Sequence, residues 1–91
     1  MYMYYVYLLE SKDSESDFIY TGYTNDLERR LKSHNDKQVQ STKHEAPFEL
    51  VYYEAYRSKS DAKEREKQLK RHAQAYTALK ERVQDSFMSS K

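Results

Sequence analysis

Residues 2–10 are the stretch of this sequence that most restricts its fold. They form an almost unbroken run of tyrosine, methionine, valine and leucine that ends in Glu10. A run of this length, made of aromatic and aliphatic residues and followed by a polar segment, favours a strand that is buried on both faces. We therefore expect the chain to fold around this strand, with the strand at the centre of its sheet.

A second strand and a first helix are predicted next. Residues 18–24 favour a strand that pairs with the first as an antiparallel hairpin across a polar loop. Asn25 has a residue type that caps helix N-termini, and Glu28 then occupies the third helical position, so we expect a helix from there to about residue 35. Its inward side chains should be Leu27, Leu31 and His34.

A third strand and two more helices are predicted in the second half of the chain. Residues 48–56 favour a strand with Phe48, Leu50 and Tyr52 on one face and Val51, Tyr53 and Ala55 on the other. Helices are expected at about 60–71, capped by Ser58 or Ser60, and at 73–83. The side chains expected to face inward from these helices are Ala62, Glu66, Leu69, Tyr76, Leu79 and Val83.

Together these elements predict one α+β domain over residues 1–83. It would contain a small three-stranded antiparallel sheet flanked by helices, in the order β-β-α-β-α-α, and residues 84–91 would be a frayed tail. The chain has no cysteine, which excludes disulfides and thiolate metal sites. It has no segment of about 18 apolar residues and no signal-peptide pattern. We therefore expect no membrane association and a cytoplasmic location, while the oligomeric state stays undetermined.

Charge is distributed unevenly, although the net charge is only +1. Basic side chains outnumber acidic ones within residues 57–72, which include the second predicted helix. This helix would either attract phosphate groups or expose a solvated face on which opposite charges four residues apart form ion pairs. The pattern alone leaves both interpretations open.

Two charged residues lie toward the apolar sides of their predicted helices. Arg30 lies beside the inward stripe of the first helix, where a guanidinium is costly unless it meets an anion or reaches water along its aliphatic stem. Glu66 shares a face with Ala62 and Leu69, so its carboxylate should be paired, with Lys70 or with Arg30, or should coordinate a hard cation.

Tyr7, Tyr20 and His34 complete the set of candidates. Hairpin pairing can bring Tyr7 and Tyr20 side by side on one face of the sheet, where two phenols could hold a water or a phosphate oxygen. Any one of the ten tyrosines in this chain is more often a packing residue. His34 follows Arg30 by one helical turn and could contact phosphate, protonate a leaving group or interact with the helix dipole.

The order of these residues resembles the GIY-YIG nuclease superfamily. The similarity covers roughly residues 4–72 and is closest to small single-domain bacterial members related to the N-terminal nuclease domain of the excision-repair enzyme UvrC. Each short motif is weak by itself, but the ordered set with Arg30 and Glu66 is specific. The segments that carry the resemblance are residues 5–7, 20–22, 26–34, 41–42, 47–54 and 62–70.

The resemblance implies a role for each candidate. Tyr7 would help to activate the water nucleophile, Tyr20 would position water and the scissile phosphate, and Arg30 would neutralise charge on that phosphate. Glu66 would bind one divalent metal, Mg²⁺ or Mn²⁺. His34 corresponds to a histidine found only in some members, and we count it among the catalytic candidates. The expected substrate contacts are Gly22, Lys32, Lys63 and Lys70.

The expected function is therefore metal-dependent hydrolysis of phosphodiester bonds in DNA, with structured or damaged DNA among the candidate substrates and DNA repair as the implied process. Tyr5 stands where the family name has glycine, Thr21 stands where it has isoleucine, and Glu45 lies in a loop that is often more basic in relatives. The alternative is a non-catalytic module that keeps the fold to bind nucleic acid or a protein. A third interpretation is a site that becomes active only with a protein partner. We expect Gly22 to lack a side chain because substrate or the helix of Arg30 passes close by.

Overall fold

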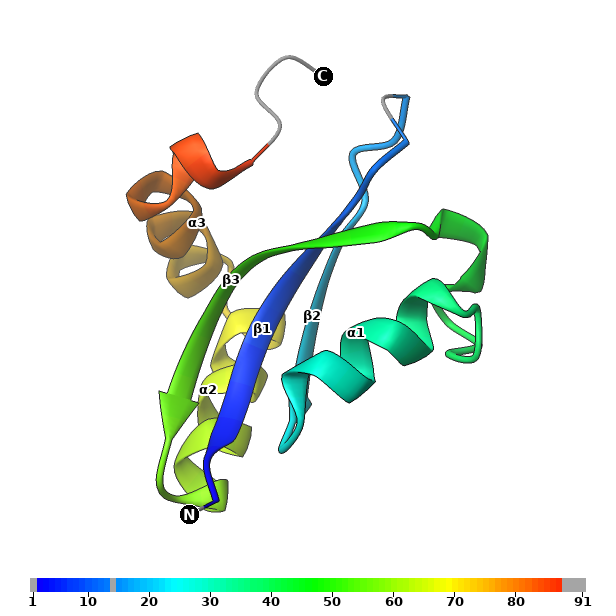
Figure 1. Cartoon of the computed structure of the whole chain (residues 1–91). Coiled ribbons are helices and arrows are strands. Elements are labelled where there is room, and N and C mark those ends of the chain that lie inside the picture. The colour runs from blue at the N-terminus through cyan, green and yellow to red at the C-terminus, as the bar shows by residue number, and fades with distance from the viewer. Residues whose placement is uncertain (1, 14, 88–91) are drawn as a thin grey trace.

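The computed structural model describes residues 2–13 and 15–87 and confirms the α+β class (Figure 1). A three-stranded sheet has helices packed on it, in the chain order β-β-α-β-α-α that the sequence predicts. The elements are β1 (Tyr4–Ser11), β2 (Ile19–Thr24), α1 (Leu27–Asn35), β3 (Phe48–Tyr56), α2 (Lys59–Arg71) and α3 (Ala73–Arg82), with short 3₁₀ turns at Lys43–Glu45 and Gln84–Ser86.

The N-terminal strand lies at the centre of the sheet, as its apolar sequence predicts. The strand order is β2-β1-β3 and both pairings are antiparallel. Residues 6–11 of β1 are all buried, because the neighbouring strands satisfy the backbone of β1 while helices cover its two faces. The strand β2 is an edge strand.

Each face of the sheet has its own apolar cluster. Tyr7, Leu9 and Phe48 pack on the face covered by α1, where Leu27 and Leu31 contact them. The opposite face packs against α2 and α3, which stand on the other side of the sheet from α1 (Figure 1). The residues at the centre of that second cluster are Val6, Leu8, Ala62, Leu69 and Leu79, with Tyr76 and Val83 packed beside them as predicted.

A β-bulge in β3 corrects the predicted alternation of that strand. The register changes between Leu8 and Leu9, so that Leu8 pairs with Tyr52 while Leu9 pairs with Leu50. Val51 is the additional residue in β3. An extra residue in one strand moves the side chains that follow it to the opposite face of the sheet. Phe48 and Leu50 therefore pack with α1, whereas Tyr52 packs with the α2 and α3 cluster.

The helix α1 begins one residue later than predicted. Asp26, and not Asn25, is the N-cap, and its side chain accepts a hydrogen bond from the Arg29 backbone N–H at 3.2 Å. At the other end, the Asn35 side chain holds the start of β3, because it accepts from the Phe48 N–H and donates to the Phe48 carbonyl. The contacts between Asn35 and Phe48 attach the end of α1 to the sheet.

A charged cluster attaches α2 to β3. The Glu54 carboxylate accepts two hydrogen bonds from Arg65, from Nε at 2.9 Å and from Nη2 at 3.1 Å. The hydroxyl groups of Tyr52 and Tyr56 donate to the same carboxylate. Ser58 caps the helix by accepting from the backbone N–H of Asp61. A bidentate pair is directional, so it restricts the rotation of α2 about its axis.

The described chain continues past the expected domain boundary at residue 83. Gln84–Ser86 form a 3₁₀ turn, and Phe87 packs against the cluster that contains Leu79. The remainder of the expected frayed tail, residues 88–91, lies outside the described residues. None of the described helices combines the length and the apolar character needed to cross a membrane.

Candidate active site

Tyr7 occupies the centre of the site, on the face of the sheet that carries α1. Its side chain is only 2% exposed, and its ring lies 6.1 Å from that of Tyr20, centroid to centroid. The two tyrosines share one face, as predicted, but they are diagonal neighbours. The residue directly opposite Tyr7 is Gly22, and Tyr20 is opposite Leu9.

Gly22 has a reason different from the expected one for lacking a side chain. A Cβ at this position would lie 2.4 Å from both Cζ and the hydroxyl oxygen of Tyr7, and 2.7 Å from Cε2 of Tyr20. The group that passes close to the glycine is therefore the Tyr7 phenol, not the helix that carries Arg30. Gly22 makes room for the ring to lie across β2.

The Tyr7 hydroxyl joins two residues of α1. Its oxygen lies 3.0 Å from Nε2 of His34 and accepts a hydrogen bond from Nε of Arg30 at 3.3 Å. His34 is fully buried, and its other ring nitrogen, Nδ1, lies 2.8 Å from the Thr42 hydroxyl. Residues one helical turn apart lie on the same face of a helix, which is why both Arg30 and His34 reach one phenol.

Burial holds both central groups in their neutral forms at neutral pH. It raises the pKa of Tyr7 from 10.0 to about 12, although the hydrogen bond from Arg30 opposes this shift. Burial, together with the positive charge of Arg30, lowers the pKa of His34 from 6.5 to about 4. The site thus holds a neutral phenol between a cation and a neutral imidazole.

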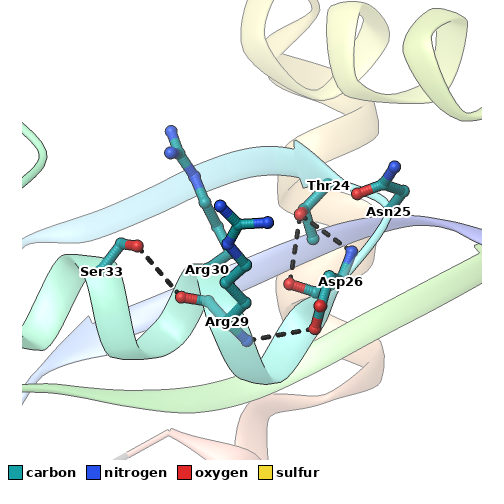
Figure 2. Close-up of a pocket in the computed structure, with 6 residues that line it drawn as sticks. All are labelled: Thr24, Asn25, Asp26, Arg29, Arg30 and Ser33. Atoms are coloured by element: carbon teal, nitrogen blue, oxygen red, sulfur yellow. Dashed lines mark hydrogen bonds between the residues drawn. The ribbon is translucent and has the colours of Figure 1, made fainter.

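Arg30 opens onto two adjoining hollows at the surface. One, of about 260 Å³, is lined by Thr24, Asn25, Asp26, Arg29, Arg30 and Ser33 and is shown in Figure 2. The other, of about 350 Å³, is lined by Tyr23, Thr24, Asn25, Arg30, Lys59 and Lys63. The Asp26 carboxylate in the first hollow already caps α1. The hollows are therefore dominated by basic side chains and suit an anion.

An ion pair with a carboxylate was one of the alternatives that the sequence left open for Arg30, and the described part of the structure does not show it. Among the described residues, no carboxylate lies within salt-bridge distance of its guanidinium. Glu66 instead pairs with Lys70, at 3.1 Å between Oε2 and Nζ, which is one of the two pairings the sequence left open. The Arg30 guanidinium therefore lies at the edge of the buried region and donates to the Tyr7 hydroxyl. Its positive charge is available to a ligand.

Glu66 and Lys70 reach the site around the edge of the sheet. The helix α2 lies on the opposite face from Tyr20, yet Nζ of Lys70 lies 5.7 Å from the centroid of the Tyr20 ring. Because β2 is an edge strand, long side chains from α2 can pass beside it. Glu66 is close enough for its charge to influence Tyr7, and its side chain is 23% exposed.

The donor set fits a metal that keeps most of its water. No group of three or more acidic or histidine side chains that could enclose an ion occurs among residues 2–13 and 15–87. Mg²⁺ retains several waters and is commonly held by one or two carboxylates together with substrate phosphates. Glu66 offers one such carboxylate, with a side chain that is 23% exposed, although it lines neither of the two hollows.

The lysines predicted to contact substrate lie in different surroundings. Lys63 lines the second hollow with Arg30, and its ammonium lies 5.8 Å from the centroid of the Tyr23 ring. Lys70 is paired with Glu66. Lys32 is largely exposed, pairs with Asp36 and lines neither hollow, so the structure does not bring it to the cluster.

Two residues of the site were missed by the sequence interpretation. Arg29 lines the first hollow but lies in a run of charged residues where nothing distinguishes it. Thr42 contacts His34 from a polar loop that has no periodic pattern. The segment 41–42 contributes to the family resemblance, and that match was the only signal that could have pointed to Thr42.

Comparison with known proteins finds a matching family and several similar sequences. The family model described as the GIY-YIG catalytic domain matches residues 3–80. The UPF0213 protein CPE1444 of Clostridium perfringens is 41% identical over 70 residues, which are 76% of this chain and 72% of the relative. The UPF0213 protein SH2523 of Staphylococcus haemolyticus is 42% identical over 71 residues, or 77% and 83% of the two chains.

A solved structure is also similar to this chain. The solution NMR structure of the UPF0213 protein BH0048 from Bacillus halodurans is 37% identical, covers 86% of this chain and 85% of its own, and has a TM-score of 0.49. The family model spans most of the 91 residues, from β1 to α3. The chain therefore belongs to the GIY-YIG family of nuclease catalytic domains.

Proposed function

We propose that this protein is an endonuclease that hydrolyses phosphodiester bonds in DNA with the help of one divalent metal ion. The observation that carries the proposal is the position of the Tyr7 hydroxyl, between the cation of Arg30 and the neutral ring of His34. A phenol in this position accepts a hydrogen bond from a cation and has a ring nitrogen of a neutral imidazole within hydrogen-bond distance.

The guanidinium of Arg30 supplies the positive charge for the reaction. Attack on a phosphodiester adds negative charge to the phosphoryl oxygens, and preorganised cations stabilise that charge strongly in a site with little water. Arg30 opens onto both hollows and has no carboxylate partner among the described residues. It can therefore contact a phosphate without first breaking an ion pair.

Tyr7 and His34 provide a route for a proton. As a water oxygen forms its bond to phosphorus, the Tyr7 oxygen takes a proton from that water while the phenol gives its own proton to Nε2 of His34. The bond from phosphorus to the 3′ oxygen breaks, and the departing 3′ oxygen takes a proton from solvent water, which leaves a 3′ hydroxyl and a 5′ phosphate. His34 is neutral beforehand, so one of its ring nitrogens can accept a proton, but its pKa of about 4 makes the ring a weak base.

Glu66 is the residue that would hold the metal. A divalent ion bound there would supply the second positive charge that offsets the charge developing on the phosphate. Lys70 presently neutralises this carboxylate, so the ion must displace its ammonium. Tyr20, whose ring packs against both Tyr7 and His34, would hold the substrate oxygen or water on the outer side of the site.

DNA would be held through its backbone by the basic side chains around the two hollows. The groups available are Arg29, Arg30, Lys59 and Lys63. Contacts to phosphate position a nucleic acid but carry no sequence information. We therefore propose that the isolated domain recognises the shape of its DNA more than its sequence. Because these contacts are to phosphates, its binding should weaken steeply as salt rises.

The test is cleavage of linear and branched DNA with Mg²⁺ or Mn²⁺. Arg30→Ala and Glu66→Gln should each lose at least about 100-fold in rate, since removing one charge-stabilising group commonly costs that much. The matched controls are Arg82→Ala and Glu81→Gln, which change the same charges on the exposed side of α3. If the wild type binds DNA but cuts none of the substrates, the domain is a binding module and the proposal fails.

A further inference from the structure

Thr42 is a buried polar residue that none of the roles above uses. It lies in the loop between α1 and β3, its side chain is fully buried, and its hydroxyl oxygen lies 2.8 Å from Nδ1 of His34. The same oxygen lies 3.4 Å from the Val39 carbonyl, to which the hydroxyl can donate. A buried hydroxyl with two specific partners restricts the hydrogen bonds that each partner can make.

Within the described part of the chain, the His34 ring has two hydrogen-bonding partners. Aromatic rings surround it, with centroids of Tyr20 at 4.9 Å and Phe48 at 5.8 Å. The two nitrogens therefore have the Tyr7 hydroxyl and the Thr42 hydroxyl as their partners in the structure. A neutral imidazole carries one proton, so one nitrogen must donate and the other must accept.

The directions of the neighbouring bonds decide between the two tautomers. Arg30 donates to the Tyr7 oxygen, so the phenol proton itself still needs an acceptor. Nε2 of His34 is the acceptor that the structure places within reach, at 3.0 Å. The imidazole proton then belongs on Nδ1, where the Thr42 oxygen accepts it while the threonine proton is directed to Val39.

We infer that Thr42 is a positioning residue that holds His34 in the Nδ1–H tautomer and thereby leaves Nε2 free to take the proton of Tyr7. The inference rests on the proposed function for its consequence in catalysis, but the tautomer itself is a property of the resting protein. Threonine suits the position because its hydroxyl can accept from a ring nitrogen and donate to a carbonyl at once. In the reverse tautomer, His34 would donate to Tyr7 and could not receive a proton from it.

The first experiment measures the tautomer in the wild-type protein. The ¹⁵N resonances of the three histidine rings would be recorded at pH 7, and those of His34 would be assigned by their absence in His34→Gln. His44 and His72 are exposed and serve as internal references. We expect a protonated Nδ1 and an unprotonated Nε2 in His34. A protonated Nε2 would overturn the inference, whether or not the protein cuts DNA.

The second experiment compares Thr42→Val with Thr42→Ser. Valine has nearly the shape of threonine but cannot accept, so His34 should change to the Nε2–H tautomer and the cleavage rate should fall at least tenfold at saturating DNA. Serine retains the hydroxyl and should restore both the tautomer and the rate. If Thr42→Val is folded and His34 keeps the Nδ1–H form, Thr42 does not set the tautomer. A valine variant that fails to fold leaves the wild-type and serine spectra to decide. An inactive wild type with the expected tautomer would count against the nuclease proposal alone.

Discussion

Replacing Gly22 with alanine should destabilise the domain although the backbone accepts alanine at this position. Gly22 does not have a positive φ, so no backbone strain is expected. Alanine at an unstrained site normally stabilises by about 0.4–1 kcal/mol, because it restricts the unfolded chain. The new Cβ, however, would lie 2.4 Å from the Tyr7 hydroxyl and Cζ, about 1 Å short of ordinary contact.

The collision must therefore move the Tyr7 ring. Overpacking of a filled interior costs about 1–3 kcal/mol, which outweighs the gain from the unfolded chain. A shift of about 1 Å also breaks the 3.0 Å contact with His34 and the 3.3 Å bond from Arg30. We expect a net loss of roughly 0.5–2 kcal/mol in stability and, on the proposed function, about 100-fold in cleavage rate, the usual effect of misplacing a reacting group by 1 Å.

The assay is urea unfolding of a double-mutant cycle with Tyr7→Leu. Leucine keeps apolar bulk near the strand but lacks the Cζ and hydroxyl atoms that collide, and Tyr20 is only half-buried and can move outward. Gly22→Ala should therefore destabilise the wild type and be neutral or stabilising in Tyr7→Leu, with a coupling energy of about 1–3 kcal/mol. Equal effects in the two backgrounds would refute the reasoning.

Three further predictions concern the charged groups. Glu54→Gln should cost about 2 kcal/mol in urea unfolding, because it removes the charge that Arg65 needs while leaving Arg65 half-buried; an unchanged midpoint would contradict this role. Because the pKa of His34 is lower in the folded protein than in the unfolded chain, the unfolded chain is protonated at a higher pH, and stability should fall as pH drops from 6.5 toward 4. The free energy of unfolding of His34→Gln should fall less steeply over this range. If the variant and the wild type lose stability in parallel, His34 is not the cause. Lys70→Met should strengthen binding of Mn²⁺ to the DNA-free protein several-fold in calorimetry, since the ammonium no longer competes for Glu66; the same affinity in both proteins would show that the ion pair does not compete.

Much of the secondary structure was predictable because it depends on local patterns. The apolar run of the first strand identified the sheet centre, and the spacing of Leu27, Leu31 and His34 identified the buried face of α1. The local sequence pattern could not decide between neighbouring residues that suit the same structural role. Asn25 and Asp26 are both good caps, and which of them meets the free N–H groups depends on how β2 leads into the helix.

The bulge at Val51 shows the limit of periodicity more clearly. A strict alternation assigned Phe48, Leu50 and Tyr52 to one face, and nothing in the sequence marks the extra residue. The way in which β3 pairs with β1 decides where the register changes. The sequence pattern likewise placed Arg30 and Glu66 near apolar faces but left open whether they pair with each other.

By itself, the sequence determined the order of elements, the family and the residue types available for chemistry, since these follow from composition, local periodicity and motif spacing. Only the tertiary structure decided which of those residues meet. Contacts between a hairpin, two helices and a loop depend on register and packing, which no local pattern encodes. That is why the sequence did not reveal that Gly22 leaves room for the Tyr7 ring or that Lys32 lies apart from the cluster. It is also why Thr42, which is far from the tyrosine motifs in sequence, contacts His34 in the folded protein.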